Sequence, residues 1–487
     1  MLKEMAAMVW KKSGWFRWSR AAAVFLCLAV LLGPPAVSRA EDSAFSLSLP
    51  KQVKGFSMCE ISVRAPAAGE VLLTLTDSLG NPWLFRRESL TDGENVLPWD
   101  GRGAGGELLM SGPYRLTAEF SAADGREFTA SAAFEVRGYA PALCLALPSS
   151  EILYLDQGER WFVECWVASS CIVAMDILDA GGNRVYTRSV TLQNPERDLI
   201  RWNGNGSNNR KVAPGEYTVH IYPKKNPDFG YTWPLTVKEH TPDPLPLDLT
   251  GPVIPEREMS DEEIWEIMMK PSVVINHTGA SLRFKVYESP SLKSKAIGLL
   301  CCATQGLEVL ALEGDWAQVR AGNYNNGKLL TGWFPVRDLV TVSPAPHYAV
   351  LVDKRAQTLT VWQDGHPVGT VPVSTGLPTA KAPERETSPG AFLTDIHIAR
   401  DFAQDGARYD YPLRYQGGNI IHSTGYARIP HAAYSVKDYS KNLPLLGQKA
   451  SHGCVRVSPF ASADCPVNSY WLWTHLPYHT RVIILDD

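Results

Sequence analysis

Several reactive side chains are grouped in one short segment near the C-terminus. Residues 451–457 read Ser-His-Gly-Cys-Val-Arg-Val, which places a thiol, an imidazole, a glycine and a guanidinium close together. A cysteine is a nucleophile only as its thiolate, and a histidine can take and return a proton near neutral pH. Glycine permits a tight backbone turn, and a guanidinium can hold a carboxylate. This combination favours nucleophilic catalysis by Cys454 over the commoner role of a buried, inert cysteine.

Histidine is concentrated in the same region. Eight of the eleven histidines fall within the 145 residues from 343 to 487. On paper a zinc site could be assembled from these side chains, but the spacings match no standard short zinc motif, and the glycine between His and Cys suits a catalytic turn better. The four ligands of that alternative would be His422, His431, His452 and Cys454. We therefore predict an enzyme that uses no metal and no other cofactor.

Length and composition describe the molecule that must position these residues. At about 150 residues per domain, 487 residues indicate about three domains, and an apolar content of 45% is ample for several cores. The 47 basic and 51 acidic residues give a net charge of -4, which lacks the positive excess that phosphate-backbone binding needs. Nucleic acid is therefore not an expected partner. The 38 glycines and 35 prolines favour turn-rich β structure.

Residues 1–40 have the organisation of a secretory signal peptide. The basic residues Lys11, Lys12, Arg17 and Arg20 precede the uncharged apolar run 21–32, and the small residues Ser38 and Ala40 suggest cleavage before Glu41. As a helix, that run spans about 18 Å against a hydrocarbon core of about 30 Å, so a retained membrane anchor is the less favoured alternative. We expect a protein exported from the cytoplasm, with no stable membrane span after signal cleavage.

Two motifs recur at one common spacing in the N-terminal half. Trp-Asp-Gly at 99–101 and Trp-Asn-Gly at 202–204 lie 103 residues apart, as do Gly-Pro-Tyr at 112–114 and Gly-Glu-Tyr at 215–217. A shared spacing indicates a duplication, and the alternating strands around these motifs predict two β-sandwiches, at 41–139 and 140–240. The pattern resembles the Ig-like domain of flagellar hook-capping proteins, which implies a spacer or adhesive module without chemistry.

A linker and a small barrel are predicted next. Residues 241–270 combine a proline-rich linker with a short helix, which starts at the capping box of Ser260 and Glu263 and which we expect to dock on the next domain. Residues 271–342 contain short strands, and the runs 286–290, 314–319 and 332–334 resemble bacterial SH3-like domains. This resemblance implies a wall-binding module with glycan strands as a candidate partner, and a plain structural spacer is the alternative.

The motif S-H-G-C-[hydrophobic]-R at 451–456 resembles that of the L,D-transpeptidases of bacterial peptidoglycan, which have the YkuD-like catalytic domain. The likeness covers residues 343–487. It includes an opening hairpin at 348–362, a T-P-x-G-x-F turn at 387–392 with Ser388 replacing the first proline, and a closing helix and strand. The predicted fold is therefore mostly β: two tandem β-sandwiches, an SH3-like barrel and a C-terminal L,D-transpeptidase-type β domain with a short helix.

The resemblance also implies a role for each residue of the site. Cys454 would be the nucleophile, and His422, on the strand at 419–424, would be the base that removes its proton. Ser423 would orient the imidazole through its backbone carbonyl, and backbone N–H groups around Gly453 and Cys454 would stabilise the oxyanion. The remaining residues would shape the turn (His452 and Gly453) or contact the donor substrate (Arg456 and Ser451).

The implied substrates are peptidoglycan stem peptides, in the cell wall or periplasm. The thiolate would attack the carbonyl at the L-centre of the diamino acid in a tetrapeptide stem and release D-alanine. An amine of another stem would then resolve the thioester to form a cross-link. Two alternatives remain: an L,D-carboxypeptidase, in which water is the acceptor, and a non-catalytic scaffold that only binds the wall.

Two features of this region need an explanation of their own. The interval of 32 residues between His422 and Cys454 is longer than in many family members, so residues 425–450 are predicted to form an enlarged lid. His431 lies within it and competes for the role of base, but an apolar strand positions His422 better. Of the nine cysteines, Cys27 would leave with the signal. We predict that Cys454 is a free, reactive thiol and that most of the others are buried.

Overall fold

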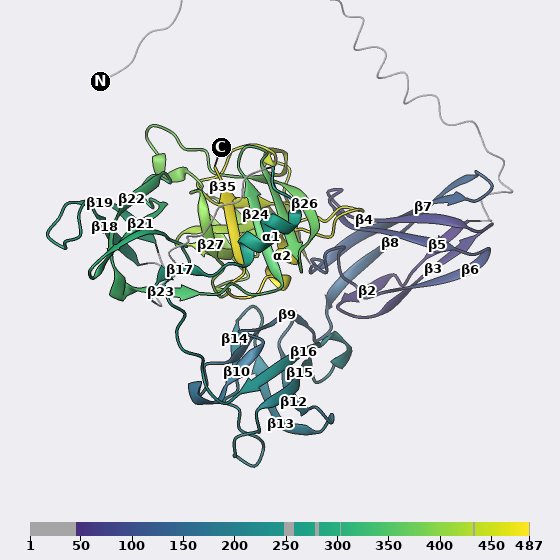
Figure 1. The fold of residues 1–487 in the computed structure, drawn as a ribbon. Coiled ribbons are helices and arrows are strands. Elements are labelled where there is room, and N and C mark those ends of the chain that lie inside the picture. The colour runs from purple at the N-terminus through teal and green to yellow at the C-terminus, as the bar shows by residue number, and fades with distance from the viewer. Residues whose placement is uncertain (1–44, 248–257, 278–281, 302, 432–433, 487) are drawn as a thin grey trace, which may run out of the picture.

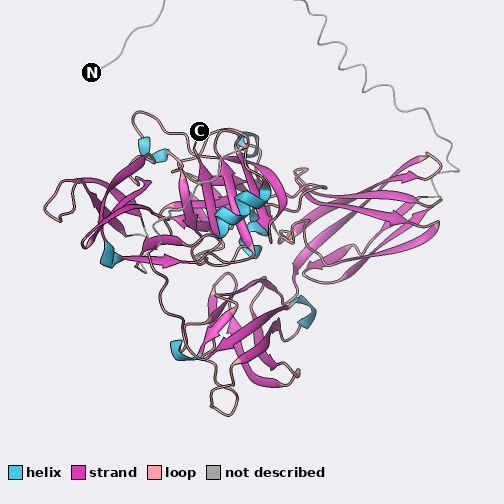
Figure 2. Cartoon of the chain, in the orientation of Figure 1, coloured by secondary structure: helices cyan, strands magenta, loops and turns pink. Residues whose placement is uncertain are grey.

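The structure is a computed structural model that describes residues 45–247, 258–277, 282–301, 303–431 and 434–486 (Figure 1). The expected signal peptide, ten residues of the expected linker and Cys302 lie outside these ranges. Strands dominate, and two α-helices occur in the described part of the chain (Figure 2). The prediction of a mostly β protein is therefore confirmed.

The N-terminal segment, residues 45–139, consists of two sheets that enclose one apolar core. Three strands have the order β1-β3-β6, and five have the order β2-β8-β7-β4-β5. The strands are β1 (Ser46–Ser48), β2 (Gln52–Gly55), β3 (Cys59–Ala65), β4 (Gly69–Asp77), β5 (Pro82–Leu90), β6 (Gly93–Trp99), β7 (Gly112–Ala122) and β8 (Glu127–Tyr139).

The second segment, residues 140–238, repeats this arrangement strand for strand. Its sheets have the orders β9-β11-β14 and β10-β16-β15-β12-β13, and the parallel pair of β2 with β8 recurs as β10 with β16. The elements are β9 (Leu143–Pro148), β10 (Ile152–Tyr154), η1 (Leu155–Gln157), β11 (Phe162–Val167), β12 (Cys171–Asp179), β13 (Arg184–Leu192), β14 (Asp198–Arg201), β15 (Gly215–Pro223), η2 (Pro227–Phe229) and β16 (Tyr231–Lys238).

The equally spaced motifs have equivalent structural roles in the two segments. The indole of Trp99 donates to the carbonyl of Arg102 (2.9 Å), and that of Trp202 donates to Asn205 (2.8 Å). A buried indole N–H or phenol O–H needs such a partner, because burying a polar group without one is costly. The tyrosines behave likewise: Tyr114 donates to the carbonyl of Met110 (2.9 Å) and Tyr217 to that of Ala213 (2.8 Å). The duplication inferred from spacing is thus present in the topology.

The third segment, residues 271–342, is a small β body with its own core. Its sheets have the orders β17-β23 and β19-β18-β22-β21-β20. The elements are β17 (Ser272–Ile275), β18 (Arg283–Tyr287), β19 (Ala296–Cys301), β20 (Glu308–Glu313), β21 (Trp316–Gly322), β22 (Leu329–Pro335), η3 (Val336–Asp338) and β23 (Leu339–Val342).

The helix α1 (Asp261–Met269) precedes the third segment and has the predicted capping box at its start. The prediction that this helix docks on the third segment was wrong. The buried side chains Ile264 and Met268 pack instead in a cluster with residues of the C-terminal sheet. The reason lies at its C-terminal end, where Arg481, which is 2% exposed, donates to the carbonyls of Met268 (3.0 Å) and Lys270. These bonds satisfy carbonyls that the end of a helix leaves without partners.

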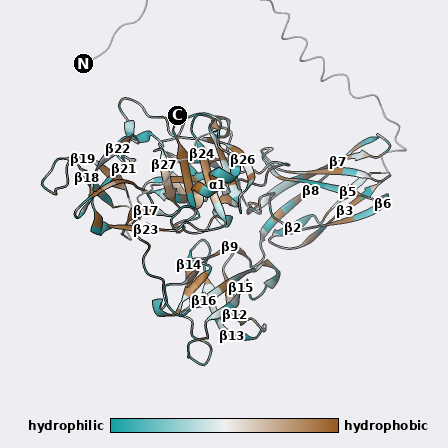
Figure 3. Ribbon diagram, in the orientation of Figure 1, coloured by the Kyte–Doolittle hydropathy of each residue, from teal (hydrophilic) through white to brown (hydrophobic). Residues whose placement is uncertain are grey.

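The C-terminal segment, residues 343–486, is built on an eight-stranded sheet with the order β27-β35-β24-β25-β26-β34-β31-β30. Its central strands are strongly apolar (Figure 3), and β35 is buried along its whole length. The elements are β24 (Tyr348–Asp353), β25 (Thr358–Gln363), β26 (His366–Ser374), η4 (Pro383–Arg385), β27 (Gly390–Leu393), β28 (Asp401–Gln404), β29 (Ala407–Asp410), β30 (Leu413–Gln416), β31 (Asn419–Ser423), β32 (Ala427–Pro430), β33 (Ser435–Asp438), η5 (Leu443–Leu445), β34 (Val455–Val457), α2 (Ser469–His475) and β35 (Arg481–Leu485).

The segment 425–450, predicted as a lid, contains the hairpin β32–β33, which packs on the N-terminal segment. Tyr426 and Tyr439 belong to the apolar core of that segment. The ring of Phe460 meets Trp83 edge-on at 4.9 Å, and the amide of Asn81 donates to the carbonyl of Lys437 (3.1 Å). The N-terminal segment therefore holds this hairpin in place.

Candidate active site

His422 and Cys454 are brought together by two parallel strands. In the pairing of β31 with β34, Ile421 lies opposite Val455 and His422 lies opposite Arg456. Cys454 directly precedes β34. Side chains alternate along a strand, so a residue two positions before Arg456 faces the same side of the sheet as His422. The register therefore brings Cys454 and His422 to diagonal positions of neighbouring chain segments, although 32 residues separate them in the sequence.

The imidazole of His422 is held by its own chain. Its Nδ1 lies 2.7 Å from the backbone oxygen of Ser423, the contact that the sequence analysis expected. A carbonyl oxygen can only accept, so Nδ1 carries the proton and the lone pair is on Nε2. The side chain of Ser423 accepts a hydrogen bond from the N–H of Asp410 (2.8 Å), which anchors the end of β31. The ring is thus fixed in the tautomer that can accept a proton.

A hairpin that the sequence analysis did not single out covers this imidazole. Phe402 of β28 and Tyr409 of β29 meet the ring of His422 edge-on, at centroid distances of 5.3 and 4.8 Å. His422 is only 3% exposed, and this burial lowers its pKa to about 3, with the nearby guanidinium of Arg456 acting in the same direction. The imidazole is therefore neutral at physiological pH. The sequence signal was the Asp405-Gly406 pair, a common hairpin turn.

Cys454 is half-buried, and its Sγ lies 3.9 Å from the carbonyl oxygen of Gly418. Burial raises the pKa of its thiol, while the backbone N–H of Ile420 and the guanidinium of Arg456 oppose this rise. A raised thiol pKa beside a lowered imidazole pKa means that the resting pair is neutral.

The turn before Cys454 depends on Gly453. Its φ is +115°, and a Cβ at this position would lie 2.7 Å from Oδ1 of Asn419. Ser451, which is 1% exposed, closes the turn: its hydroxyl donates to the carbonyl of Cys454 (2.6 Å) and accepts from the N–H of Gly453 (3.1 Å). The N–H of Gly453, which was expected among the oxyanion donors, donates to the hydroxyl of Ser451 in this structure. Ser451 itself contacts the backbone of the turn.

Thr387 is a site residue whose role the sequence analysis missed. Its fully buried hydroxyl accepts from the N–H of Gly376 (2.8 Å) and donates to the carbonyl of Gly453 (2.9 Å). One side chain thus ties the turn at 387–392 to the strand end at Gly376 and to the turn at Gly453. The family-like motif around it was visible in the sequence, but its hydrogen-bond partners, 11 and 66 residues away, were not.

The other predicted residues differ in how closely they approach His422 and Cys454. The guanidinium of Arg456 stands 5.7 Å from the ring centre of Tyr409 and supplies a positive charge next to His422. His452 points outward, with its side chain 42% exposed and its Nδ1 3.3 Å from Asp405. His431, the competing base, is exposed and stacks on Tyr434 at 4.5 Å.

The described residues contain no group of three or more His, Cys, Asp or Glu side chains that could hold a metal ion. No helix within the described ranges is long and apolar enough to cross a membrane. Cys454 is a free thiol. The other described cysteines are less uniformly buried than predicted: Cys144, Cys165 and Cys301 are buried, whereas Cys59, Cys171 and Cys465 are partly exposed.

Comparison with known proteins identifies the C-terminal segment. Residues 347–484 match the YkuD family of L,D-transpeptidase catalytic domains. The putative L,D-transpeptidase YciB of Bacillus subtilis is 24% identical over 175 residues, which are 35% of this chain and 74% of YciB. The C-terminal segment is thus an L,D-transpeptidase catalytic domain of the YkuD family, a family of cysteine transpeptidases, and the chain is an enzyme of this class.

Solved structures show weaker overall likeness. An L,D-transpeptidase from Mycobacterium smegmatis is 14% identical, with 56% of this chain and 96% of that chain covered and a TM-score of 0.22. One from Mycobacterium tuberculosis is 16% identical, with coverage of 45% and 92% and a TM-score of 0.22. Latent PorU from Porphyromonas gingivalis is matched over 40% of this chain but only 20% of its own length, at 11% identity and a TM-score of 0.21.

Proposed function

We propose that the protein is a peptidoglycan L,D-transpeptidase in which Cys454 is the nucleophile and His422 is the general base. The observation that carries this proposal is the pairing of β31 with β34, which sets a buried, neutral imidazole beside the thiol. The Nδ1 of that imidazole is already occupied by the Ser423 carbonyl, so only Nε2 can accept a proton. This arrangement lies within a domain of a cysteine transpeptidase family.

The first half-reaction forms a thioester. Nε2 of His422 takes the thiol proton as Sγ of Cys454 bonds to the carbonyl carbon at the L-centre of the diamino acid in a tetrapeptide stem. When the tetrahedral intermediate collapses, the carbon–nitrogen bond to the terminal D-alanine breaks. The leaving amine receives the proton from His422, which returns to its neutral form. The positive charge of Arg456 beside the pair favours a donor that carries a carboxylate.

The second half-reaction reverses the proton transfers. The amine of another stem attacks the thioester carbonyl, His422 removes a proton from it, and Cys454 leaves as a thiol. The product is a cross-link between two stems. If water attacks instead, the product is a tripeptide stem and the enzyme acts as an L,D-carboxypeptidase.

The test is to incubate the full-length protein with purified disaccharide tetrapeptide and to read the products by mass spectrometry. Dimers lacking one D-alanine are expected. Cys454→Ala should abolish the reaction, whereas Cys465→Ala, a matched loss of another partly exposed thiol, should not. Tripeptide alone would establish the carboxypeptidase instead, and unchanged substrate would refute both activities and favour a scaffold.

The other parts of the chain fit an exported wall enzyme. The duplicated N-terminal segments are proposed to be Ig-like sandwiches, and the third segment is proposed to be an SH3-like barrel. The proposed location is the cell wall or periplasm, where the stem peptides are. Export and signal cleavage are tested by determining the N-terminus of the mature protein, which is expected at Glu41.

A further inference from the structure

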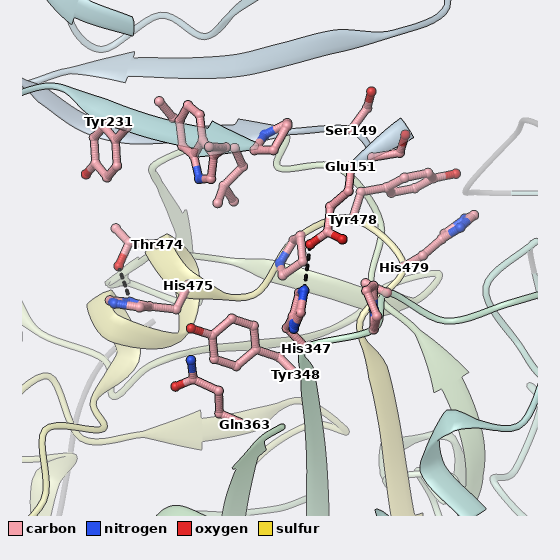
Figure 4. Close-up of a pocket in the computed structure, with 18 of the residues that line it drawn as sticks. Ser149, Glu151, Tyr231, His347, Tyr348, Gln363, Thr474, His475, Tyr478 and His479 are labelled. Carbon is pink, nitrogen blue, oxygen red and sulfur yellow. Dashed lines mark hydrogen bonds and ion pairs between the residues drawn. The ribbon is translucent and has the colours of Figure 1, made fainter. Parts of the chain in front are cut away.

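A large cavity lies between the second segment and the catalytic domain, apart from the site of Cys454. Its volume is about 1100 Å³, and none of the proposed active-site residues lines it. One wall is formed by β9, β10 and β16 of the second segment, and the other by the start of β24 together with α2 (Figure 4). This volume is at the upper end of the range of about 300–1,000 Å³ that small-molecule sites occupy.

Both walls present paired aromatic rings. On β16, Tyr231 and Trp233 point to the same side and stack with centroids 5.5 Å apart and an interplanar angle of 2°. On α2, the rings of Trp471 and His475 stack at 4.2 Å and 6°, and Tyr348 meets Trp471 edge-on. Tyr231, Trp233 and Tyr348 are only partly buried. Flat, half-exposed rings on opposite walls form stacking surfaces for a ligand that enters between them.

The charged groups in the lining are paired with one another or with close neighbours. His347 bridges the two walls, with its Nε2 2.7 Å from Glu151 and its Nδ1 2.6 Å from Asp364. The guanidinium of Arg102 is 2.5 Å from Asp100. Figure 4 shows the contact between His347 and Glu151 spanning the cavity.

The two remaining histidines in the lining add no charge. Burial lowers the pKa of His475, and it lowers the pKa of His479 to about 4, with Arg481 contributing. Both imidazoles are therefore neutral at pH 7. Glu151 and Asp364 share the one imidazole of His347, so the lining keeps a net negative charge, which disfavours an anionic ligand. The cavity is suited to an uncharged ligand with both apolar and hydrogen-bonding surfaces.

We propose that this cavity binds the glycan strand of peptidoglycan, as an uncharged oligosaccharide of N-acetylated amino sugars. A pyranose ring has apolar C–H faces, which stack on aromatic rings, and a rim of hydroxyl and acetamido groups, which form hydrogen bonds. The exposed amide of Gln363 lies in the lining and meets that second requirement. The choice of ligand rests on the proposed function, since the active site would act on stems attached to such a strand.

The test uses the full-length protein and chitotetraose, the tetramer of N-acetylglucosamine, as the probe, with binding measured by calorimetry. Trp233→Ala should weaken binding by at least about tenfold, a loss of about 1.4 kcal/mol. Trp233→Phe, which keeps a ring, should stay within about threefold of the wild type. Gln363→Ala, at an exposed position that does not threaten folding, should also weaken binding. The matched control is Tyr186→Ala, which removes a partly buried ring from the second segment outside the cavity lining and should bind as the wild type does.

Acylation of Cys454 by a carbapenem is measured on the same proteins, so that failure of the catalytic proposal is seen separately. We expect all four variants to be acylated at the wild-type rate, because the cavity does not include the active site. The glycan proposal would be overturned if the wild type did not bind chitotetraose at millimolar concentration. It would also be overturned if Tyr186→Ala lost binding while Trp233→Ala kept it, or if a sugar-free tetrapeptide competed for the cavity.

Discussion

Acidification from pH 7 to pH 5 should leave the rate of Cys454 acylation nearly unchanged, because His422 stays neutral over this range. The imidazole is buried under Phe402 and Tyr409, and its pKa is lowered from 6.5 to about 3. An exposed histidine, by contrast, would become protonated between pH 7 and pH 5 and would no longer accept the thiol proton. The expected rate law is that of a neutral base which takes the thiol proton during the attack.

The size of the effect follows from the two pKa values. With an ordinary pKa of about 6.5, the neutral fraction of the imidazole would fall from about 76% at pH 7 to about 3% at pH 5, and the rate would fall about 25-fold. With a pKa of about 3, about 99% stays neutral at pH 5, and the change should be less than twofold. The difference between these values corresponds to about 5 kcal/mol of unfavourable desolvation of the charged form.

The assay follows the covalent adduct of the intact protein with a carbapenem by mass spectrometry at several pH values. Phe402→Ala removes one of the two rings that cover His422 and admits water to it. This variant should therefore gain an acid limb between pH 5 and pH 7. The matched control is Tyr434→Ala, which removes a ring from the neighbouring hairpin β32–β33 and should keep the flat profile. Circular dichroism at each pH checks that the proteins stay folded.

Two results would refute this reasoning. A wild-type rate that falls tenfold or more between pH 7 and pH 5 would show that His422 titrates as an exposed imidazole does. A rate that rises tenfold per pH unit throughout would show that a preformed thiolate reacts without help from His422.

Three further predictions concern the turn and the domain contact. Gly453→Ala forces a side chain to a φ of +115° and against Asn419, so acylation should slow by at least about 100-fold. Thr387→Val leaves the N–H of Gly376 and the carbonyl of Gly453 without their partner, and urea denaturation should show a loss of about 1–3 kcal/mol in unfolding free energy. The hydrogen bond with Asp364 and the charge of Glu151 raise the pKa of His347, so the stability from this bridge is complete below about pH 6.5 and is lost as pH rises through the raised value. The bridge contributes less than about 1 kcal/mol to the unfolding free energy. The Tm difference between the wild type and Glu151→Gln should therefore be small at low pH and should shrink as pH rises.

Matched controls exist for the first two of these changes. Gly314→Ala also alters a glycine with a positive φ, +55°, but no atom lies within 4 Å of the added Cβ, so acylation should not change. Thr360→Val removes a hydroxyl from an exposed pair with Thr370 and should cost less than about 0.5 kcal/mol. Equal effects of a control and its partner would contradict the structural explanation. For the bridge between His347 and Glu151, a Tm difference between the wild type and Glu151→Gln that grew above pH 7 would contradict the explanation.

The sequence by itself determined the catalytic family of the C-terminal segment, the duplication and the predominance of strands. These conclusions rest on local patterns: the tight turn around Gly453, the recurring tryptophan and tyrosine motifs, and the alternation of apolar residues. Each of these patterns specifies the conformation or packing of a few neighbouring residues, so it can be recognised without the rest of the molecule. The capping box of α1 was visible for the same reason.

Only the tertiary structure decided the chemical state of the site and the contacts between segments. The neutrality of His422 depends on Phe402 and Tyr409, which lie in a separate hairpin, and on desolvation that no spacing reveals. The docking of α1 depends on Arg481, more than 200 residues away. The cavity between the second segment and the catalytic domain exists only once both are folded and packed together. Burial and charge pairing arise from residues far apart in the sequence, and therefore local patterns do not encode them.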